Sequence, residues 1–116
     1  MKVIKSSELK QEESTSKLFQ GKVYLQRLVD EKTAKGIRVS MVNFSPGAKN
    51  VFHSHTSEQV LYVIDGKGIV ATEKEEYVVM PGTVVFIPPG ERHWHGATKD
   101  TSFSHLSIIT PGETSF

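Results

Sequence analysis

The sequence predicts an all-β protein built as a single antiparallel sandwich or barrel, and three observations lead to this prediction. From Lys22 onward, short runs rich in Val, Ile, Tyr and Phe are separated by Gly, Pro, Asp and Asn at strand-length intervals. Only residues 6–19 have a composition that could form a helix of any length. The 116 residues suffice for one domain with one modest core. Many short strands in one small domain favour a sandwich or a barrel.

The chain divides into an N-terminal arm, residues 1–21, and a β-domain, residues 22–116. The arm contains mostly Glu, Lys, Gln and Ser, so we expect it to be loose or to form a short helix. No repeat or low-complexity segment interrupts the β-domain, so no further boundary is expected. Its expected strands are 23–29, 36–44, 51–55, 59–64, 68–72, 76–79, 83–87, 93–96 and 103–109.

Turn sequences between these strands support the arrangement. Each combines the fixed φ of proline, or a positive φ that glycine tolerates, with an apolar run on either side. The clearest are Ser45-Pro46-Gly47, Asp65-Gly66-Lys67-Gly68, Met80-Pro81-Gly82 and Pro88-Pro89-Gly90. The chain is therefore predicted to reverse direction repeatedly.

Composition excludes several classes of function. The absence of cysteine rules out disulfides and thiolate ligands, so any bound metal must be held by nitrogen and oxygen atoms. With 14 basic and 13 acidic residues the net charge is +1, and because the basic residues are scattered we expect no nucleic-acid partner. No run is apolar enough for a signal peptide or a membrane span, so we expect no membrane partner and a cytoplasmic protein.

Four of the five histidines lie immediately after predicted turns, in two close pairs. His53 and His55 are two residues apart in an expected strand, so both imidazoles should point to the same side. Gln59 opens the next strand, and a hairpin would return its amide to their neighbourhood. His93 follows a second tight turn. Because a lone histidine is more often a surface or hydrogen-bonded residue than a ligand, the surrounding spacing decides the interpretation.

That spacing resembles the two sequence motifs of the cupin superfamily. GAKNVFHSHTSEQVLYVIDG, residues 47–66, is similar to the first motif, G-x(5)-H-x-H-x(3,4)-E-x(6)-G, and departs only in having Gln59 for the Glu. GTVVFIPPGERHWHGA, residues 82–97, is similar to the second, G-x(5)-P-x-G-x(2)-H-x(3)-N, and departs only in having Ala97 for the Asn. The resemblance implies a single jelly-roll β-barrel.

It also implies one divalent metal ion per chain, held by His53, His55, Gln59 and His93. Glu58 is an alternative fourth ligand, but the six-residue spacer to Gly66 counts correctly only from Gln59. Because three imidazoles and an amide are neutral, the ion would keep its full +2 charge and act as a stronger Lewis acid. Such ligands suit Mn²⁺, Fe²⁺, Zn²⁺, Ni²⁺ and Co²⁺, with open positions for a small-molecule substrate.

Two further histidines are candidates for acting on a bound substrate. His95 is two residues past His93, so both should face one cavity, where His95 serves either as a general base or only as a hydrogen-bonding group. The pattern around His105 does not show which face of its strand is buried. We expect a small and mostly apolar cavity, lined by Ser40, Val42, Leu61 and Val63.

Over most of its length the chain further resembles the bacterial cupin hydroxynitrile lyases. FSPG at 44–47, H-x-H-x(3)-Q at 53–59 and PGERHWHGA at 89–97 carry this similarity. It implies Mn²⁺ as the ion, with His95 and His105 handling the proton while a carbon–carbon bond breaks to release an aldehyde and cyanide. Ile109 stands where these lyases tend to carry a polar residue. Cupins encoded with carboxymuconolactone decarboxylase-like proteins share the same pattern.

Three functions remain open from the sequence alone. The first is a metal-dependent lyase of hydroxynitriles or related hydroxy-carbonyl compounds. The second is an Fe²⁺-dependent dioxygenase, since three histidines with open positions can bind O₂ beside a substrate. The third is a non-catalytic cupin that binds or senses a small molecule. We also expect a homodimer, because an outward apolar face needs a cover, and this face should contain Val60, Tyr62 and Ile64.

Overall fold

The computed structural model describes the whole chain, residues 1–116, and its regular secondary structure consists almost entirely of antiparallel strands. One 3₁₀ turn, η1 (Ser6–Glu8), precedes them. The strands are β1 (Glu12–Glu13), β2 (Phe19–Gln20), β3 (Val23–Val29), β4 (Arg38–Phe44), β5 (Lys49–Asn50), β6 (Ser54–His55), β7 (Gln59–Gly66), β8 (Gly68–Thr72), β9 (Glu76–Val79), β10 (Val84–Ile87), β11 (His93–Ala97), β12 (Phe103–Ile109) and β13 (Thr114–Ser115).

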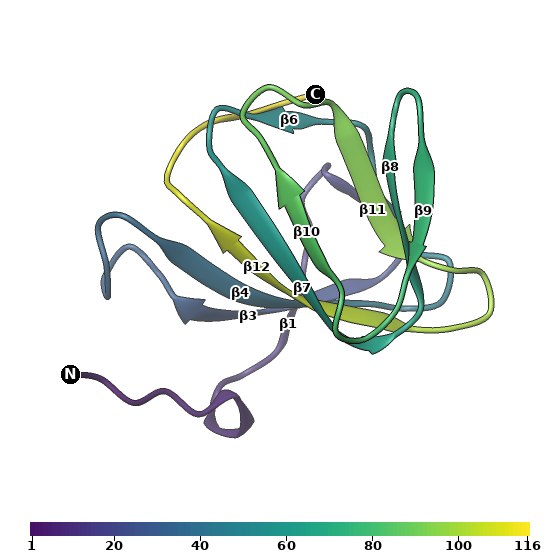
Figure 1. Cartoon of the computed structure of the whole chain (residues 1–116). Coiled ribbons are helices and arrows are strands. Elements are labelled where there is room, and N and C mark those ends of the chain that lie inside the picture. Colours follow the sequence, from purple (N-terminus) through teal and green to yellow (C-terminus); the bar gives the residue numbers. More distant parts are fainter.

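Two main sheets enclose the interior as a jelly-roll barrel (Figure 1). The first has the strand order β1-β3-β4-β12-β7-β10, and the second has the order β2-β5-β11-β8-β9. A small third sheet pairs β13 with β6. The predicted all-β class and the antiparallel barrel are therefore confirmed.

Side-chain alternation along β7 follows the predicted register. Gln59, Leu61 and Val63 are 6 %, 0 % and 1 % exposed, whereas Tyr62 and Ile64 are each 40 % exposed. Successive side chains of a strand point to opposite faces, so Gln59, Leu61 and Val63 enter the barrel. Gln59 therefore begins β7 with its amide turned inward.

In the first sheet, paired residues on neighbouring strands form rows that cross the sheet. The rows on the inner face change from apolar to polar from one end of the barrel to the other. The first row contains Val23, Phe44 and Phe103, which are essentially unexposed. The rings of Phe44 and Phe103 stack with centroids 5.8 Å apart. A Cβ on Gly68 would lie only 2.5 Å from the Phe103 ring, so this close approach requires glycine. This end of the barrel is thus filled by the apolar core.

The next two rows are progressively more polar. The second row runs through Leu25, Val42, His105 and Val63 in register. The third row places polar side chains opposite one another, and it consists of Arg27, Ser40, Ser107 and Leu61. A functional cavity is therefore expected at this second end, away from the phenylalanines.

The expected strand 51–55 is wrong in one respect, because the chain changes sheets within it. β5 ends at Asn50, where it pairs with β2 and β11, and β6 begins at Ser54 and pairs with β13. Between them, His53 forms an isolated bridge with His93. The chain bends here because its hydrogen-bonding partner changes, which a local pattern of side chains does not record.

The N-terminal arm is more closely joined to the barrel than its composition indicates. Glu12–Glu13 adds β1 to the edge of β3, and Phe19–Gln20 adds β2 to β5. The side-chain amide of Gln26 on β3 donates to the carbonyls of Ser6 and Leu9 at 2.9 and 3.0 Å, which ties η1 to the barrel, while the N-terminus projects from the body of the molecule (Figure 1). No helix in the structure is both long and apolar enough to cross a membrane.

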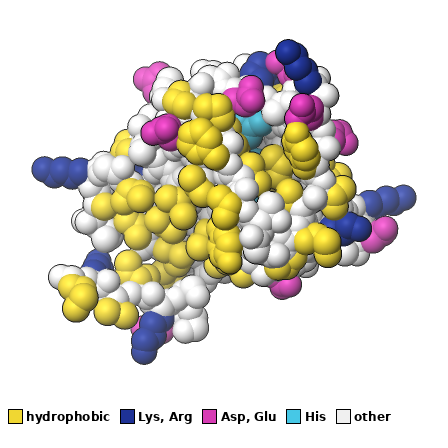
Figure 2. All heavy atoms as spheres, in the orientation of Figure 1, with side chains coloured by type: hydrophobic (Ala, Val, Ile, Leu, Met, Phe, Trp, Pro, Cys, Tyr) yellow, Lys and Arg dark blue, Asp and Glu magenta, His cyan; other side chains and the backbone are white.

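Hydrophobic side chains gather on the face of the molecule shown in Figure 2. On the outer surface of β7 and β10, Val84 lies opposite Tyr62 and Phe86 lies opposite Val60. Val84 is 62 % exposed and Phe86 is 56 % exposed, although both are large apolar residues. We call the outward face formed by Val60, Tyr62, Ile64, Val84 and Phe86 the apolar face.

Candidate metal centre

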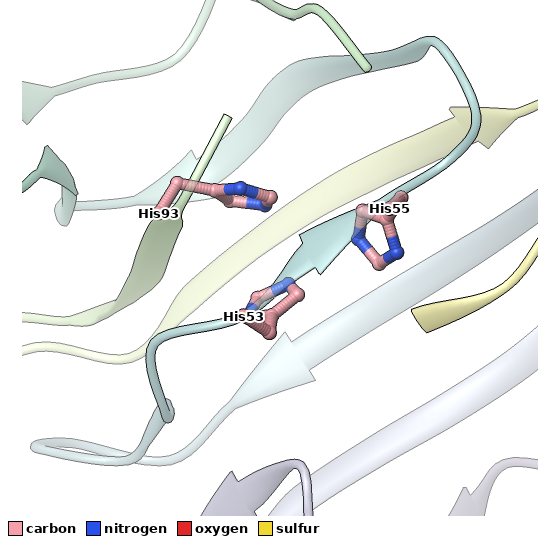
Figure 3. Close-up of side chains that lie close together, drawn as sticks. All are labelled: His53, His55 and His93. Atoms are coloured by element: carbon pink, nitrogen blue, oxygen red, sulfur yellow. The ribbon is translucent and has the colours of Figure 1, made fainter. Parts of the chain in front are cut away.

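Three predicted ligands, His53, His55 and His93, converge inside the barrel. One ligand atom from each of them lies within 4.8 Å of the others. Figure 3 shows the three rings turned toward a common space, with His53 and His55 on one stretch of chain and His93 on β11. The backbones of His53 and His93 exchange two hydrogen bonds of 3.0 and 2.9 Å. The pairing of the two segments therefore sets the distance between the rings.

Each of these imidazoles is held through its Nδ1 atom. The ring of His53 donates to the carbonyl of Val51 at 2.7 Å, and that of His93 donates to the carbonyl of Glu91 at 2.8 Å. Nδ1 of His55 bonds to Oγ1 of Thr114 at 2.9 Å. The Nε2 atoms of His55 and His93 are buried and have no hydrogen-bond partner. Partnered Nδ1 atoms and free Nε2 atoms are the arrangement that metal-binding histidines require.

Gln59 lines the same cavity as His53 and His55, and its amide also has one partnered and one unpartnered atom. Its Nε2 donates to Oγ of Ser107 at 2.9 Å, and its Oε1 is buried without any partner. An unpaired buried carbonyl oxygen is costly, which indicates a missing partner of positive charge. Three imidazole nitrogens and one amide oxygen fit a divalent cation of borderline hardness. Glu58, in contrast, is exposed, and its main chain bonds only to Thr110.

Burial keeps these histidines neutral. It lowers the pKa of His53 to about 4 and also lowers the pKa of His93, where the bond to the Glu91 carbonyl opposes it. For His55, burial is again the largest cause of the lowered pKa, followed by the charge of His93. A neutral imidazole retains the lone pair that a cation needs, so the site is ready to bind a cation at neutral pH.

The C-terminal strand β13 fixes the position of His55. Besides the bond from Thr114, the carbonyl of Glu113 accepts from the Thr56 amide at 3.0 Å, and the Glu113 amide donates to Oγ1 of Thr56 at 2.9 Å. A Cβ on Gly112 would lie 2.1 Å from Oγ of Ser57, so glycine is needed for this close packing. Residues 112–115 thus act as a strap over the turn that carries His55.

His95 and His105 lie beside the three ligands and are both buried, at 4 % and 0 % exposed. Their ring centroids are 4.9 Å apart, and the ring of His95 stacks on that of His93 at 5.8 Å. Burial lowers the pKa of His105 to about 4 and holds that of His95 well below its usual value. The sequence left the orientation of His105 open, and the structure places it inside.

The imidazoles of His95 and His105 differ in which ring nitrogens have hydrogen-bond partners. The side-chain amide of Asn50 donates to Nε2 of His95 at 3.1 Å, and its oxygen accepts from the His95 backbone amide at 2.7 Å. Nδ1 of His105 donates to the carbonyl of Leu106 at 3.1 Å, whereas its Nε2 is buried and has no partner. His105 therefore has a free nitrogen and His95 does not.

These side chains line a cavity of about 280 Å³. Ser40 and Val42 contribute to its wall, as predicted. Leu61 and Val63 do not, although both are fully buried, so their expected place in the wall is corrected. Val63 lies opposite His105 on the neighbouring strand and belongs to the apolar core cluster. The remaining lining residues are Ser14, Ser16, Leu18, Phe19, Leu25, Arg27, Asn50, His53, His55, Gln59, His95, His105 and Ser107.

Sequence reasoning missed the residues that hold two of the candidate ligands and His95 in place. Asn50, Ser107 and Thr114 hold His95, Gln59 and His55 respectively. They are 45, 48 and 59 residues from their partners in sequence, so no local pattern pairs them. The arm contributes four lining residues that its polar composition did not reveal. Alternation along β12 would have placed Ser107 on the same face as His105, and this signal was available.

Comparison with known proteins agrees with this geometry. The Cupin domain family model, Cupin_2, matches residues 40–109. The (R)-mandelonitrile lyase of Granulicella tundricola is 38 % identical over 93 residues, which cover 78 % of this chain and 70 % of the lyase. A cupin-like protein from Thermotoga maritima is 35 % identical, with a TM-score of 0.83, over 91 % of this chain and 86 % of that one.

A third protein shows how far the fold extends beyond sequence similarity. The polyketide cyclase RemF of Streptomyces resistomycificus has a TM-score of 0.90 over 99 % of this chain and 84 % of its own, at only 21 % identity. That likeness concerns the fold alone. The family match, however, spans more than half of the chain and includes the strands that carry every candidate ligand. This chain is therefore a member of the cupin superfamily, and its sequence is similar to that of a mandelonitrile lyase.

Proposed function

We propose that this protein is a metal-dependent lyase acting on small hydroxynitrile-like or hydroxy-carbonyl compounds. The observation that carries the proposal is the buried, unpaired Nε2 of His105, which faces the same cavity as the candidate ligands. Similarity to an (R)-mandelonitrile lyase supports this reaction class. A neutral imidazole with one free nitrogen is suited to accept a proton from a bound hydroxyl group.

Each residue has a distinct role in this proposal. A cation held by His53, His55, Gln59 and His93 would supply Lewis acidity toward the substrate oxygen. His105 takes the hydroxyl proton on Nε2, and the bond to the nitrile carbon breaks with its electron pair leaving as cyanide. The imidazolium then returns the proton to cyanide, so the products are an aldehyde and hydrogen cyanide. His95 is held in place by Asn50, carries no charge, and helps to define the shape of the cavity.

We propose Mn²⁺ as the native ion, with Fe²⁺, Zn²⁺, Ni²⁺ and Co²⁺ as the alternatives that the same ligands accept. Elemental analysis of purified protein would identify it. Fe²⁺ accompanied by substrate-dependent oxygen consumption would favour a dioxygenase instead. A protein that binds small molecules without converting them would be a binding or sensor cupin.

Replacing His105 by glutamine should reduce the rate of mandelonitrile cleavage by roughly 10²- to 10⁴-fold, the usual contribution of a general base. Metal content should remain unchanged, because His105 is not among the converging ligands. Cyanide release and metal content are measured on the same samples. The matched control is His95→Gln, which should lose less activity because its Nε2 is already bonded to Asn50. Full activity in His105→Gln would refute the assigned role.

We also propose that the apolar face mediates a homodimer. β10 is an edge strand of the six-stranded sheet, and its exposed apolar residues continue those of β7. Sedimentation equilibrium at micromolar concentration should show a dimer, and Phe86→Glu should convert it to a monomer by placing a charge within the apolar face. Thr83→Glu, at the strand's start, serves as the matched charge control. A wild-type monomer under these conditions would contradict the proposal.

A further inference from the structure

Arg27 is the only formally charged side chain that lines the central cavity. The other lining residues are serines, amides, histidines and apolar side chains, and no carboxylate is among them. The wall of the cavity is therefore positive even before any cation is bound. Such a cavity favours a negatively charged ligand.

The position of Arg27 follows from the pairing of the strands. It lies opposite Ser40 on β4, and Ser40 lies opposite Ser107 on β12. Neighbouring strands are about 4.8 Å apart, so the backbones of Arg27 and Ser107 are separated by about 10 Å. Ser107 in turn bonds to Gln59, one of the candidate ligands. A small molecule at the ligands is thus within reach of the long arginine side chain.

Two further features of Arg27 indicate a binding role. A register shift between Arg27 and Val29 interrupts the pairing of β3 with β4, and such bulges commonly redirect a side chain beside a functional site. Arg27 is solvent-exposed, and its guanidinium forms neither an ion pair nor a hydrogen bond within the protein, where the ion pairs are Lys5–Glu8 and Arg92–Glu73. Arg27 also lines an outer hollow that contains Glu12 and Glu13, but neither carboxylate comes within ion-pair distance of the guanidinium.

We propose that the cavity takes a small carboxylate that also carries a hydroxyl or carbonyl oxygen, with its carboxylate bound by Arg27 and the other oxygen facing the histidines. This inference rests on the proposed function, because it names the substrate class of the same site. Guanidinium binds a carboxylate through two parallel hydrogen bonds, which an amide or a nitrile cannot replace. The hydroxyl groups of Ser14, Ser16 and Ser40 supply further donors along the same wall.

The test uses mandelate and mandelamide, which differ only in the charge at one end. Isothermal titration of each into the Mn²⁺-loaded protein should show that mandelate binds more tightly by roughly tenfold or more. Arg27→Gln should reduce this preference by roughly tenfold. The matched control is Lys99→Gln, which removes the same charge from an exposed loop outside the cavity and should leave the preference unchanged. Repeating the titrations on metal-free protein separates the contribution of Arg27 from that of the ion.

An unchanged preference in Arg27→Gln would overturn the proposal, because the carboxylate would then be bound by the ion alone. Equal binding of the two probes by the wild-type protein would overturn it as well. Neither readout depends on turnover, so failure to cleave mandelonitrile would count against the lyase reaction and leave this inference standing. Conversely, cleavage of mandelonitrile with no preference for mandelate would support the lyase reaction and contradict the proposed role of Arg27.

Discussion

Replacing His93 by alanine should abolish stoichiometric binding of a divalent cation. Its Nε2 is buried with no partner, and its ring faces those of His53 and His55. Loss of a ligand should weaken binding by more than the roughly 10- to 100-fold that accompanies loss of an outer hydrogen-bond partner. The backbone bonds between residues 53 and 93 do not involve the imidazole, so the barrel should still form. Elemental analysis and titration with Mn²⁺ provide the measurement, with circular dichroism to verify folding.

Two matched variants make this result specific. His95 lies two residues after His93 on β11 and faces the same side, and the variant His95→Gln should retain one ion per chain. Gln59→Glu should retain or tighten binding, because an ionised carboxylate is a better ligand for a dication than an amide oxygen. If the reaction requires the full charge of the ion, turnover of Gln59→Glu should fall by roughly tenfold, or about 1.4 kcal/mol. Full metal occupancy in both His93→Ala and His53→Ala would disprove the ligand assignment.

The metal-free protein should lose stability steeply as the pH falls from 7 to 5. Burial lowers the pKa of His105 to about 4, against 6.5 for an ordinary histidine. The unfolded chain therefore binds a proton that the folded chain does not, so the free energy of unfolding decreases below pH 6.5 and levels off near pH 4. At pH 5, His105 alone removes about 2 kcal/mol. This is a large part of the roughly 5–15 kcal/mol of a typical domain.

Urea unfolding at several pH values measures this loss directly. In His105→Gln, the decrease between pH 7 and pH 5 should be smaller by about 2 kcal/mol, because the titrating group is gone. Addition of Mn²⁺ should raise the free energy of unfolding at each pH without reducing its decrease between pH 7 and pH 5, because the ion excludes protons from the folded chain and not from the unfolded one. The same pH dependence in the wild type and in His105→Gln would show that this imidazole is not buried as described.

Much of the fold was predictable because the relevant signals are local. Alternation along β7 predicted that Leu61 and Val63 are buried while Tyr62 and Ile64 are exposed. Turn residues marked most strand ends within one or two positions. The break between β5 and β6 was not predictable from these signals, because it depends on partners from the arm and from β13.

In the candidate site, too, some features follow from local sequence signals and others depend on distant strands. The H-x-H spacing predicted that His53 and His55 share a side, and their ring centroids are 4.8 Å apart. Residues 103–109 carry polar and apolar groups on both faces, so the burial of His105 is decided by pairing with β4 and β7. Asn50 and Arg27 had no distinguishing neighbours in sequence. Their roles depend on which strands lie across the barrel from them.

The strap formed by residues 112–115 has a thermodynamic consequence. Thr114 and a bound cation would contact opposite nitrogens of one imidazole, that of His55. Whatever free energy the docked strap adds to cation binding, the cation must add equally to docking of the strap. Loosening of the strap should therefore weaken cation binding, and removal of the cation should loosen the strap. Docking of residues 112–115 and occupancy of the metal site would thus be coupled equilibria.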